Sequence, residues 1–155
     1  MKSIFNLNYL VAITCLVILG SCSEDKDPAK TDAEIIGSGI AWKLSAATSN
    51  NVSVISLIDL CLRDNLVTFN YETPLSIGVV DAGATKCDPT EPQTADFTWS
   101  YNETTKILTV DTNIIDVPGA QGSLMVESVT NTELVLSQNI SFSGLTQKVI
   151  LTLVH

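Results

Sequence analysis

Apolar and polar residues alternate with a period of two along most of the chain after residue 35. The pattern is sharpest in Asp96–Asn102, where aromatic residues occupy every second position and Thr, Ser and Asn the positions between. Such alternation is typical of a strand with one buried face. Turn residues separate the runs, and we expect eight strands: Ala41–Thr48, Leu66–Glu72, Leu75–Val80, Asp96–Asn102, Lys106–Asp111, Ser123–Val129, Thr132–Gln138 and Gln147–Val154.

One segment, Asn51–Asp64, departs from this period. Val54, Leu57, Ile58 and Cys61 recur at helical spacing, and polar residues that could cap a helix precede them. The β-branched residues at the start of the segment favour another strand instead. We expect a short helix that closes one end of a barrel, with the strand as the competing interpretation.

These elements predict an all-β fold. An antiparallel up-and-down meander leaves two open edges, and closing the sheet into a barrel removes both. We therefore expect a barrel of about eight strands over residues 35–155, with one short helix after the first strand. The chain after residue 21 is long enough for one domain with a substantial core and too short for two.

The N-terminus has the pattern of an export signal. Lys2 is followed by an apolar run, Tyr9–Leu19, and then by the small residues Gly20 and Ser21. The run is shorter than the roughly 20 residues that a transmembrane helix needs. Leu19-Gly-Ser-Cys22 resembles the lipobox of bacterial lipoproteins, which implies that residues 1–21 are a signal peptide and that Cys22 carries lipid. In the competing interpretation, a plain secretory signal, Cys22 is incidental.

Residues 22–34 have the composition of a flexible, acidic tether. About half of them are charged and no apolar period is present. With lipid on Cys22, this segment would connect the domain to an outer membrane as a peripheral protein. The acidic run after Cys22 also resembles a signal for display on the cell surface; orientation toward the periplasm is the alternative.

The four cysteines divide into separate roles under this interpretation. Cys15 leaves with the signal peptide and Cys22 is lipidated, so Cys61 and Cys87 remain as a pair. In an oxidising compartment such a pair forms a disulfide by default. A metal site is disfavoured because the only histidine is the C-terminal His155.

Charge and motifs exclude several classes of function. The chain without residues 1–21 has seven basic and 17 acidic side chains, a formal charge of −10, which argues against nucleic acid as a partner. We find no nucleophile elbow and no glycine-rich phosphate loop, and we expect no enzyme activity, no catalytic residue and no cofactor. The acidic residues Asp59, Asp64, Asp88 and Glu91 would meet near a Cys61–Cys87 bond, and we interpret them as solvated loop residues.

Short motifs along the domain resemble the lipocalin-like domain of bacterial surface lipoproteins. They are Ile36-Gly37, Trp42-Lys-Leu44, Cys61, Asp64-Asn65, Thr68-Phe69, Cys87-Asp-Pro89, Thr98-Trp99, Ile107-Leu-Thr109, Leu134-Val-Leu-Ser137 and the terminal Thr-Leu-Val. The resemblance implies the same barrel and the same pairing of Cys61 with Cys87. Two glycine positions differ: the first tryptophan is displaced from its glycine, and Phe97 replaces a glycine and is expected to narrow the lumen.

The barrel suggests a cup for one small ligand. Its candidate lining residues are Trp42, Phe69, Tyr71, Phe97, Trp99 and Tyr101, although aromatic residues at strand spacing are more commonly plain core. We expect a lipid-anchored, extracytoplasmic protein that binds a small apolar or amphipathic ligand. The alternative is a surface interaction protein with a filled barrel that engages a protein or glycan partner through loops such as Ala82–Gln93.

Overall fold

The computed structural model describes residues 28–112, 122–142 and 145–155. The predicted signal peptide (1–21) and Cys22 lie outside these residues. The elements in chain order are α2 (Asp32–Ile36), β1 (Ser38–Ser49), β2 (Val52–Ser53), the 3-10 turn η1 (Ile55–Leu57), α3 (Leu60–Arg63), β3 (Leu66–Asn70), β4 (Ser76–Asp81), β5 (Thr94–Asn102), β6 (Ile107–Val110), β7 (Ser123–Val129), β8 (Glu133–Phe142) and β9 (Leu145–Val154).

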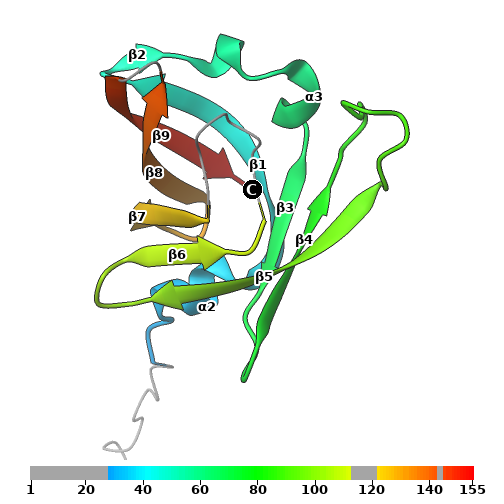
Figure 1. The fold of residues 1–155 in the computed structure, drawn as a ribbon. Coiled ribbons are helices and arrows are strands. Elements are labelled where there is room, and N and C mark those ends of the chain that lie inside the picture. The colour runs from blue at the N-terminus through cyan, green and yellow to red at the C-terminus, as the bar shows by residue number, and fades with distance from the viewer. Residues whose placement is uncertain (1–27, 113–121, 143–144) are drawn as a thin grey trace, which may run out of the picture.

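The strands form a closed antiparallel barrel, which confirms the predicted fold class (Figure 1). In the barrel, β1 pairs with β3, and each strand from β3 to β8 pairs with the strand that follows it. The pairing of β9 with β1 completes the circle. β1 serves both neighbours because it is long: its first half pairs with β3 and its second half with β9, with a register shift in each pairing. The two-residue β2 only extends the far end of β1.

The segment predicted as one helix, Asn51–Asp64, is more broken than expected. It consists of β2, η1 and the four-residue α3. The β-branched start is indeed extended, as in the competing interpretation, and helical spacing holds only for short turns after it. The two turns cover part of one barrel end, because Ile58 between them is buried in the core.

A second helix, α2, lies in residues that the sequence assigns partly to the tether. Thr31 caps it: its side-chain oxygen accepts a hydrogen bond from the amide of Glu34, and the Glu34 carboxylate accepts one from the Thr31 amide. This reciprocal arrangement satisfies two amides that a helix start leaves unpaired. Ala33 and Ile36 are buried, so the ordered domain begins at the α2 cap and residues 32–34 belong to it.

The core fills the barrel interior with side chains from every long strand. Directly paired residues have side chains on the same face, and the buried positions alternate with partly buried or exposed ones along β3, β6 and β7. The side chains with almost no exposure belong to Trp42, Phe69, Ile36, Leu108, Leu134, Leu136 and Leu153.

Candidate functional site

Four of the six predicted lining residues lie together inside the barrel. Trp42, Phe69, Phe97 and Trp99 are each at most 4% exposed. Phe69 is central to this group, since its ring meets Phe97 and Trp99 edge-to-face at centroid distances of 5.4 and 5.3 Å. This geometry suits the quadrupoles of aromatic rings. The rings of Phe69, Phe97 and Trp99 therefore form a packed floor, which we call the aromatic floor, and Trp42 is buried in the same core.

The space for Phe97 comes from a glycine on the neighbouring strand. Gly78 is the direct partner of Phe97 across β4 and β5. A Cβ atom at Gly78 would collide with the Phe97 ring. The resemblance leads us to expect a glycine at position 97, where this chain has Phe97. The glycine is instead at position 78 on the neighbouring strand, and it leaves room for the Phe97 ring.

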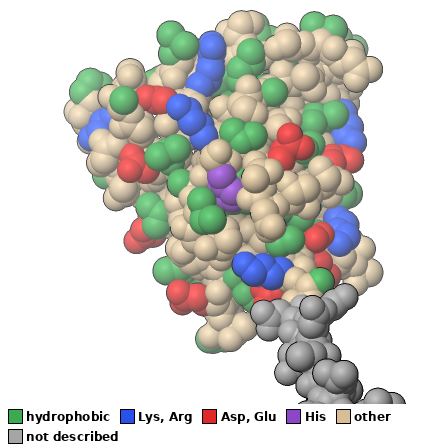
Figure 2. Space-filling view, turned by 180° about the vertical axis from the view of Figure 1, so that it is seen from behind, with side chains coloured by type: hydrophobic (Ala, Val, Ile, Leu, Met, Phe, Trp, Pro, Cys, Tyr) green, Lys and Arg blue, Asp and Glu red, His purple; other side chains and the backbone are tan. Residues whose placement is uncertain are grey.

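The displaced Trp42 is fully buried at the end of the barrel beneath α2. Its indole nitrogen donates to the Ile36 carbonyl at 3.1 Å, which ties α2 to β1. The C-terminal His155 stacks on the indole at a centroid distance of 3.6 Å, with Nδ1 3.1 Å from the Ala41 carbonyl oxygen. Figure 2 shows the histidine at the surface of the molecule, so it covers the tryptophan from outside.

The other two predicted lining residues lie at the edge of the aromatic floor, at the end of the barrel that α2 covers. Tyr71 follows the end of β3 and is 46% exposed, with its ring 6.2 Å from that of Trp99. Tyr101 is partly buried near α2, where its hydroxyl donates to the Asp32 carboxylate at 3.1 Å. Both belong to the end of the barrel that α2 closes.

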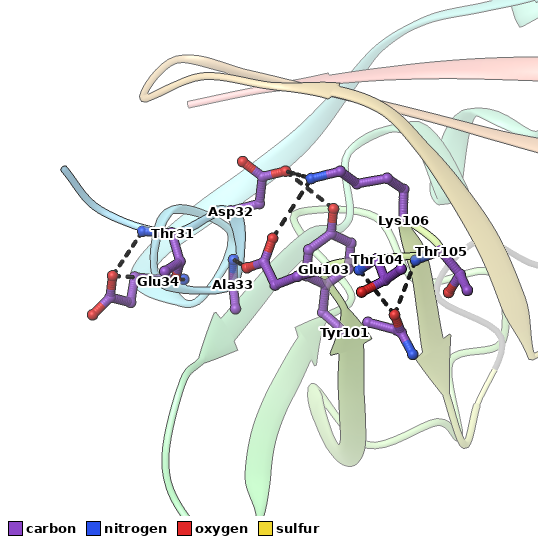
Figure 3. Close-up of polar contacts among 10 residues, drawn as sticks. Thr31, Asp32, Ala33, Glu34, Tyr101, Glu103, Thr104, Thr105 and Lys106 are labelled. Carbon is purple, nitrogen blue, oxygen red and sulfur yellow. Dashed lines mark hydrogen bonds and ion pairs between the residues drawn. The ribbon is translucent and has the colours of Figure 1, made fainter.

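A polar cluster fixes α2 to the turn between β5 and β6 (Figure 3). The Lys106 ammonium lies 2.9 Å from Asp32 and 3.6 Å from Glu103, and Glu103 accepts a hydrogen bond from the Ala33 amide at 3.0 Å. Desolvation and the hydrogen bond to Asp32 raise the pKa of Tyr101 to about 12. The hydrogen bond to Asp32 likewise raises the pKa of Lys106. We call this end of the barrel the closed end.

At the opposite end, which we call the mouth, the inward face is exposed. Leu153 and Leu151 face the interior and are 1% and 7% exposed, and every second residue of β9 shares their face. Farther along this face Val149 is half-buried, Gln147 is exposed and Leu145 is 67% exposed. The gradient shows that the apolar inner wall continues to solvent at the mouth.

The opposite wall shows the same gradient. Val80 and Ala95 are direct partners on the face that carries Gly78 and Phe97. Phe97 is 3% exposed, whereas Val80 is half-buried and Ala95 is exposed nearer the mouth. Polar groups stand on the other wall, where the Ser49 hydroxyl of β1 donates to the Gln147 side chain of β9 at 3.1 Å. The mouth therefore offers an apolar wall with a polar rim.

The segment from β2 to α3 crosses the mouth and bears large exposed apolar side chains (Figure 1). Val52, Leu57 and Leu60 are 65%, 81% and 74% exposed. The Arg63 guanidinium holds the segment together by donating to the Ile58 carbonyl at 2.7 Å. Exposed leucines on a short, internally braced segment are a surface that an apolar group can contact.

The predicted disulfide is confirmed and joins this segment to the loop between β4 and β5. Cys61 in α3 bonds to Cys87, with a Cα–Cα distance of 5.2 Å. Asp64 also holds the loop, because its carboxylate accepts from the amides of Ala84 and Thr85, both at 3.0 Å. Asp88 accepts from the Thr90 amide and hydroxyl within its own turn, and this hydrogen bonding lowers its pKa.

These acidic residues thus have structural hydrogen bonds in the loop. Within the described ranges, no cluster of three or more His, Cys, Asp or Glu side chains has the proximity to hold a metal ion. None of the helices in the described part of the chain has the length and apolar character to cross a membrane.

In comparisons with known proteins, the chain matches no family model and no curated protein. The class that the fold defines is an eight-stranded, disulfide-linked antiparallel barrel with a closed end and an apolar mouth. The architecture is compatible with a lipocalin-like ligand-binding protein.

Sequence reasoning missed the closed-end contacts of α2 and His155. The signal for α2 was present, since Thr31-Asp-Ala-Glu34 before two isoleucines has the pattern of a capping box. The stacking of His155 on Trp42 has no local signal, because it depends on the pairing of β1 with β9 across the full chain.

Proposed function

We propose that this protein is a lipid-anchored, extracytoplasmic lipocalin-like protein that binds a small apolar or amphipathic ligand at the mouth of its barrel. The observation that carries the proposal is the inward face of β9, which passes from the half-buried Val149 to the exposed Leu145, opposite Val80 and Ala95. A water-exposed apolar wall gains free energy when a ligand covers it. The polar rim at Ser49 and Gln147 suits a ligand with one polar end.

The aromatic floor would define the depth of the site. Its rings contact one another and are almost fully buried, so a ligand would rest above Phe97 and would not replace these residues. The residues expected to contact the ligand are therefore Val80, Ala95, Leu145 and Val149. Trp42 and Phe69 would support the site from below.

The anchoring part of the proposal rests on the lipobox-like Leu19-Gly-Ser-Cys22 and on the acidic residues that follow. The disulfide supports an oxidising compartment, since such bonds are rare in the reducing cytosol. We propose the outer membrane as the location, with the domain on the cell surface and the periplasmic face as the alternative. Replacing Cys22 by Ser should release a folded protein from the membrane fraction.

The ligand-binding part can be tested with a fluorescent fatty acid, dansylaminoundecanoic acid, titrated into the Cys22→Ser protein. Leu145→Glu places a charge on the inward face at the mouth and should weaken binding by roughly tenfold or more, because a buried leucine contact is lost and a carboxylate must be desolvated. Met125→Glu is the matched control: Met125 is 40% exposed, and its neighbours Leu124 and Val126 are the buried, inward residues of β7. The control should bind within about twofold of the parent.

A second function is favoured by the loop between β4 and β5. Most of its residues are exposed, yet the disulfide, Asp64 and Asp81 hold it in one conformation. A preordered exposed loop is suited to a protein or glycan partner. If neither the parent nor Met125→Glu binds the fatty acid, the ligand-binding proposal fails and this loop becomes the leading candidate.

A further inference from the structure

We propose that the closed end of the barrel rests on the bilayer that holds the lipid anchor, through an apolar patch at the turn between β3 and β4. The patch consists of Ile40, Tyr71, Leu75 and Ile77, which are 54%, 46%, 57% and 43% exposed. This inference depends on the proposed anchoring at Cys22. It adds an orientation of the domain and a second, non-covalent contact with lipid.

The four residues come from adjoining parts of the closed end: Ile40 from β1, Tyr71 and Leu75 from the β3–β4 turn, and Ile77 from β4. Asn70 pairs with both Ser38 and Ile77, so the starts of β1 and β4 flank the end of β3. The Tyr71 amide donates to the Gly37 carbonyl at 3.0 Å, and Ser76 closes the turn through hydrogen bonds with the backbone of Glu72. The exposed Tyr71 and Leu75 thus lie in a turn that is hydrogen-bonded to the closed end, and Ile40 and Ile77 lie on the strands that flank β3.

The position of the anchor selects the bilayer as the occupant of this patch. In Figure 1 the chain enters the domain at α2 from below, and the β3–β4 turn is the lowest part of the barrel. Nine residues, 23–31, separate Cys22 from α2 and can span at most about 30 Å. The ten residues of β9 alone run for about 33 Å. A tether of this length, attached at the closed end, keeps that end nearest the membrane.

The chemistry of the patch fits the interface of a zwitterionic bilayer. Leucine and isoleucine side chains favour the acyl boundary, and tyrosine favours the headgroup level with its ring buried and its hydroxyl wet. The charged side chains of α2 with the preceding Lys30, of the β3–β4 turn and of the β5–β6 turn are four acids and two bases, so an anionic surface would repel this end. They are Lys30, Asp32, Glu34, Glu72, Glu103 and Lys106.

Four partly exposed side chains bind a membrane weakly by themselves, but the anchor raises the effective concentration of the patch at the bilayer surface. A lipid on Cys22 would hold the patch within tens of ångströms of the bilayer, which makes the contact intramolecular. The domain would then stand with its mouth, and the exposed Leu57 and Leu60, directed away from its own membrane. A ligand would be taken from the aqueous side.

The test uses the lipidated chain, labelled at its Ile, Leu and Val methyl groups, in phosphatidylcholine nanodiscs that contain a gadolinium-headgroup lipid. The methyl signals of Ile40, Leu75 and Ile77 should lose at least half of their intensity, whereas those of Val52, Leu57 and Leu60 should keep theirs. Equal attenuation at the two ends, or stronger attenuation at the mouth, would overturn the proposal.

Two variants separate this inference from the anchoring proposal. Leu75→Glu/Ile77→Glu should still float with vesicles through its lipid, yet the attenuation at Ile40 should fall to the level of Leu57. Cys22→Ser should lose flotation altogether, and if it does not, the anchoring proposal fails. A further outcome would refute the membrane contact: the anchored chain sediments as a dimer, and its patch is shielded from the gadolinium lipid. The patch would then be an interface with a second copy.

Discussion

The two ends of this barrel are built differently, and the difference indicates where a ligand can bind. At the closed end, α2 lies against Trp42, and hydrogen bonds and ion pairs from Asp32, Glu103 and Lys106 fix it there. At the mouth, large apolar side chains such as Leu57 and Leu145 remain exposed, and a disulfide supplies the stability. The closed end is tightly packed, and the mouth keeps an accessible apolar surface.

The closed end should therefore carry most of the stability of the domain. Phe69→Ala removes the central ring of the aromatic floor and should lower the free energy of unfolding by about 3–5 kcal/mol. Leu145→Ala at the mouth should lower it by less than about 1 kcal/mol, since its side chain is already 67% exposed. Denaturant unfolding of both variants measures the contrast. Equal losses would contradict the difference between the two ends.

The disulfide is the main covalent support of the mouth. Replacing Cys61 and Cys87 together by Ser should cost about 2–5 kcal/mol, because the unfolded chain gains freedom when a loop of 26 positions is no longer closed. Thermal unfolding of the variant, compared with the parent under reducing and non-reducing conditions, provides the measurement. An unchanged melting temperature in both comparisons would show that the disulfide does not stabilise the mouth.

The cap of α2 contributes a smaller amount at the closed end. Thr31→Ala removes the side-chain oxygen that accepts from the Glu34 amide and should cost about 0.5–2 kcal/mol. Thr31→Ser retains the hydroxyl and is the matched control. In chemical denaturation, the parent and Thr31→Ser should have similar free energies of unfolding, and Thr31→Ala a lower one. A reversed order would refute the role of the cap.

The polar cluster at the closed end predicts a dependence on alkaline pH. The pKa of Tyr101 is raised to about 12, so the folded state holds this proton more tightly than the unfolded state does. The resulting stability is present below pH 10 and is lost as the pH rises from about 10 to about 12. Lys106, whose pKa is also raised, acts in the same direction.

Tyr101→Phe should make the unfolding free energy fall less steeply over this alkaline range. Asp32→Asn removes an acceptor that helps to raise both pKa values, so the stability lost over this alkaline range should be smaller than in the parent. Urea titrations at several pH values between 9 and 12 would follow both effects. If Tyr101→Phe and the parent show the same dependence of unfolding free energy on pH, Tyr101 is excluded as the source of that dependence.

The barrel could be predicted from sequence because its signals are local. Alternation in Asp96–Asn102 and the turns between runs identify the strands, and Cys61 and Cys87, the two cysteines outside the predicted signal and lipobox, identify the disulfide. The residues at the mouth were harder to find. Whether Phe97 fills the lumen depends on Gly78 across the sheet, and whether Leu145 is exposed depends on how far β9 extends beyond its pairing with β1, which ends at Val149.

The predicted lining set illustrates this limit. Alternation correctly grouped Phe97, Trp99 and Tyr101 on one face, but a shared face says nothing about depth along the barrel. Tyr101 lies at the closed end beside Asp32, whereas Phe97 lies in the floor. The residues that we now propose to contact a ligand, such as Val80 and Leu145, have no distinctive sequence motif, and only the exposure gradient identifies them.

Native mass spectrometry of the Cys22→Ser protein, expressed in a lipid-containing bacterial host, tests the central claim most directly. The account predicts a population whose mass exceeds that of the chain by one small apolar or amphipathic molecule. Leu145→Glu should lose that population, whereas Met125→Glu should retain it. A clean mass without ligand for the parent, together with no uptake of added fatty acid, would contradict the claim that the mouth of the barrel is a binding site.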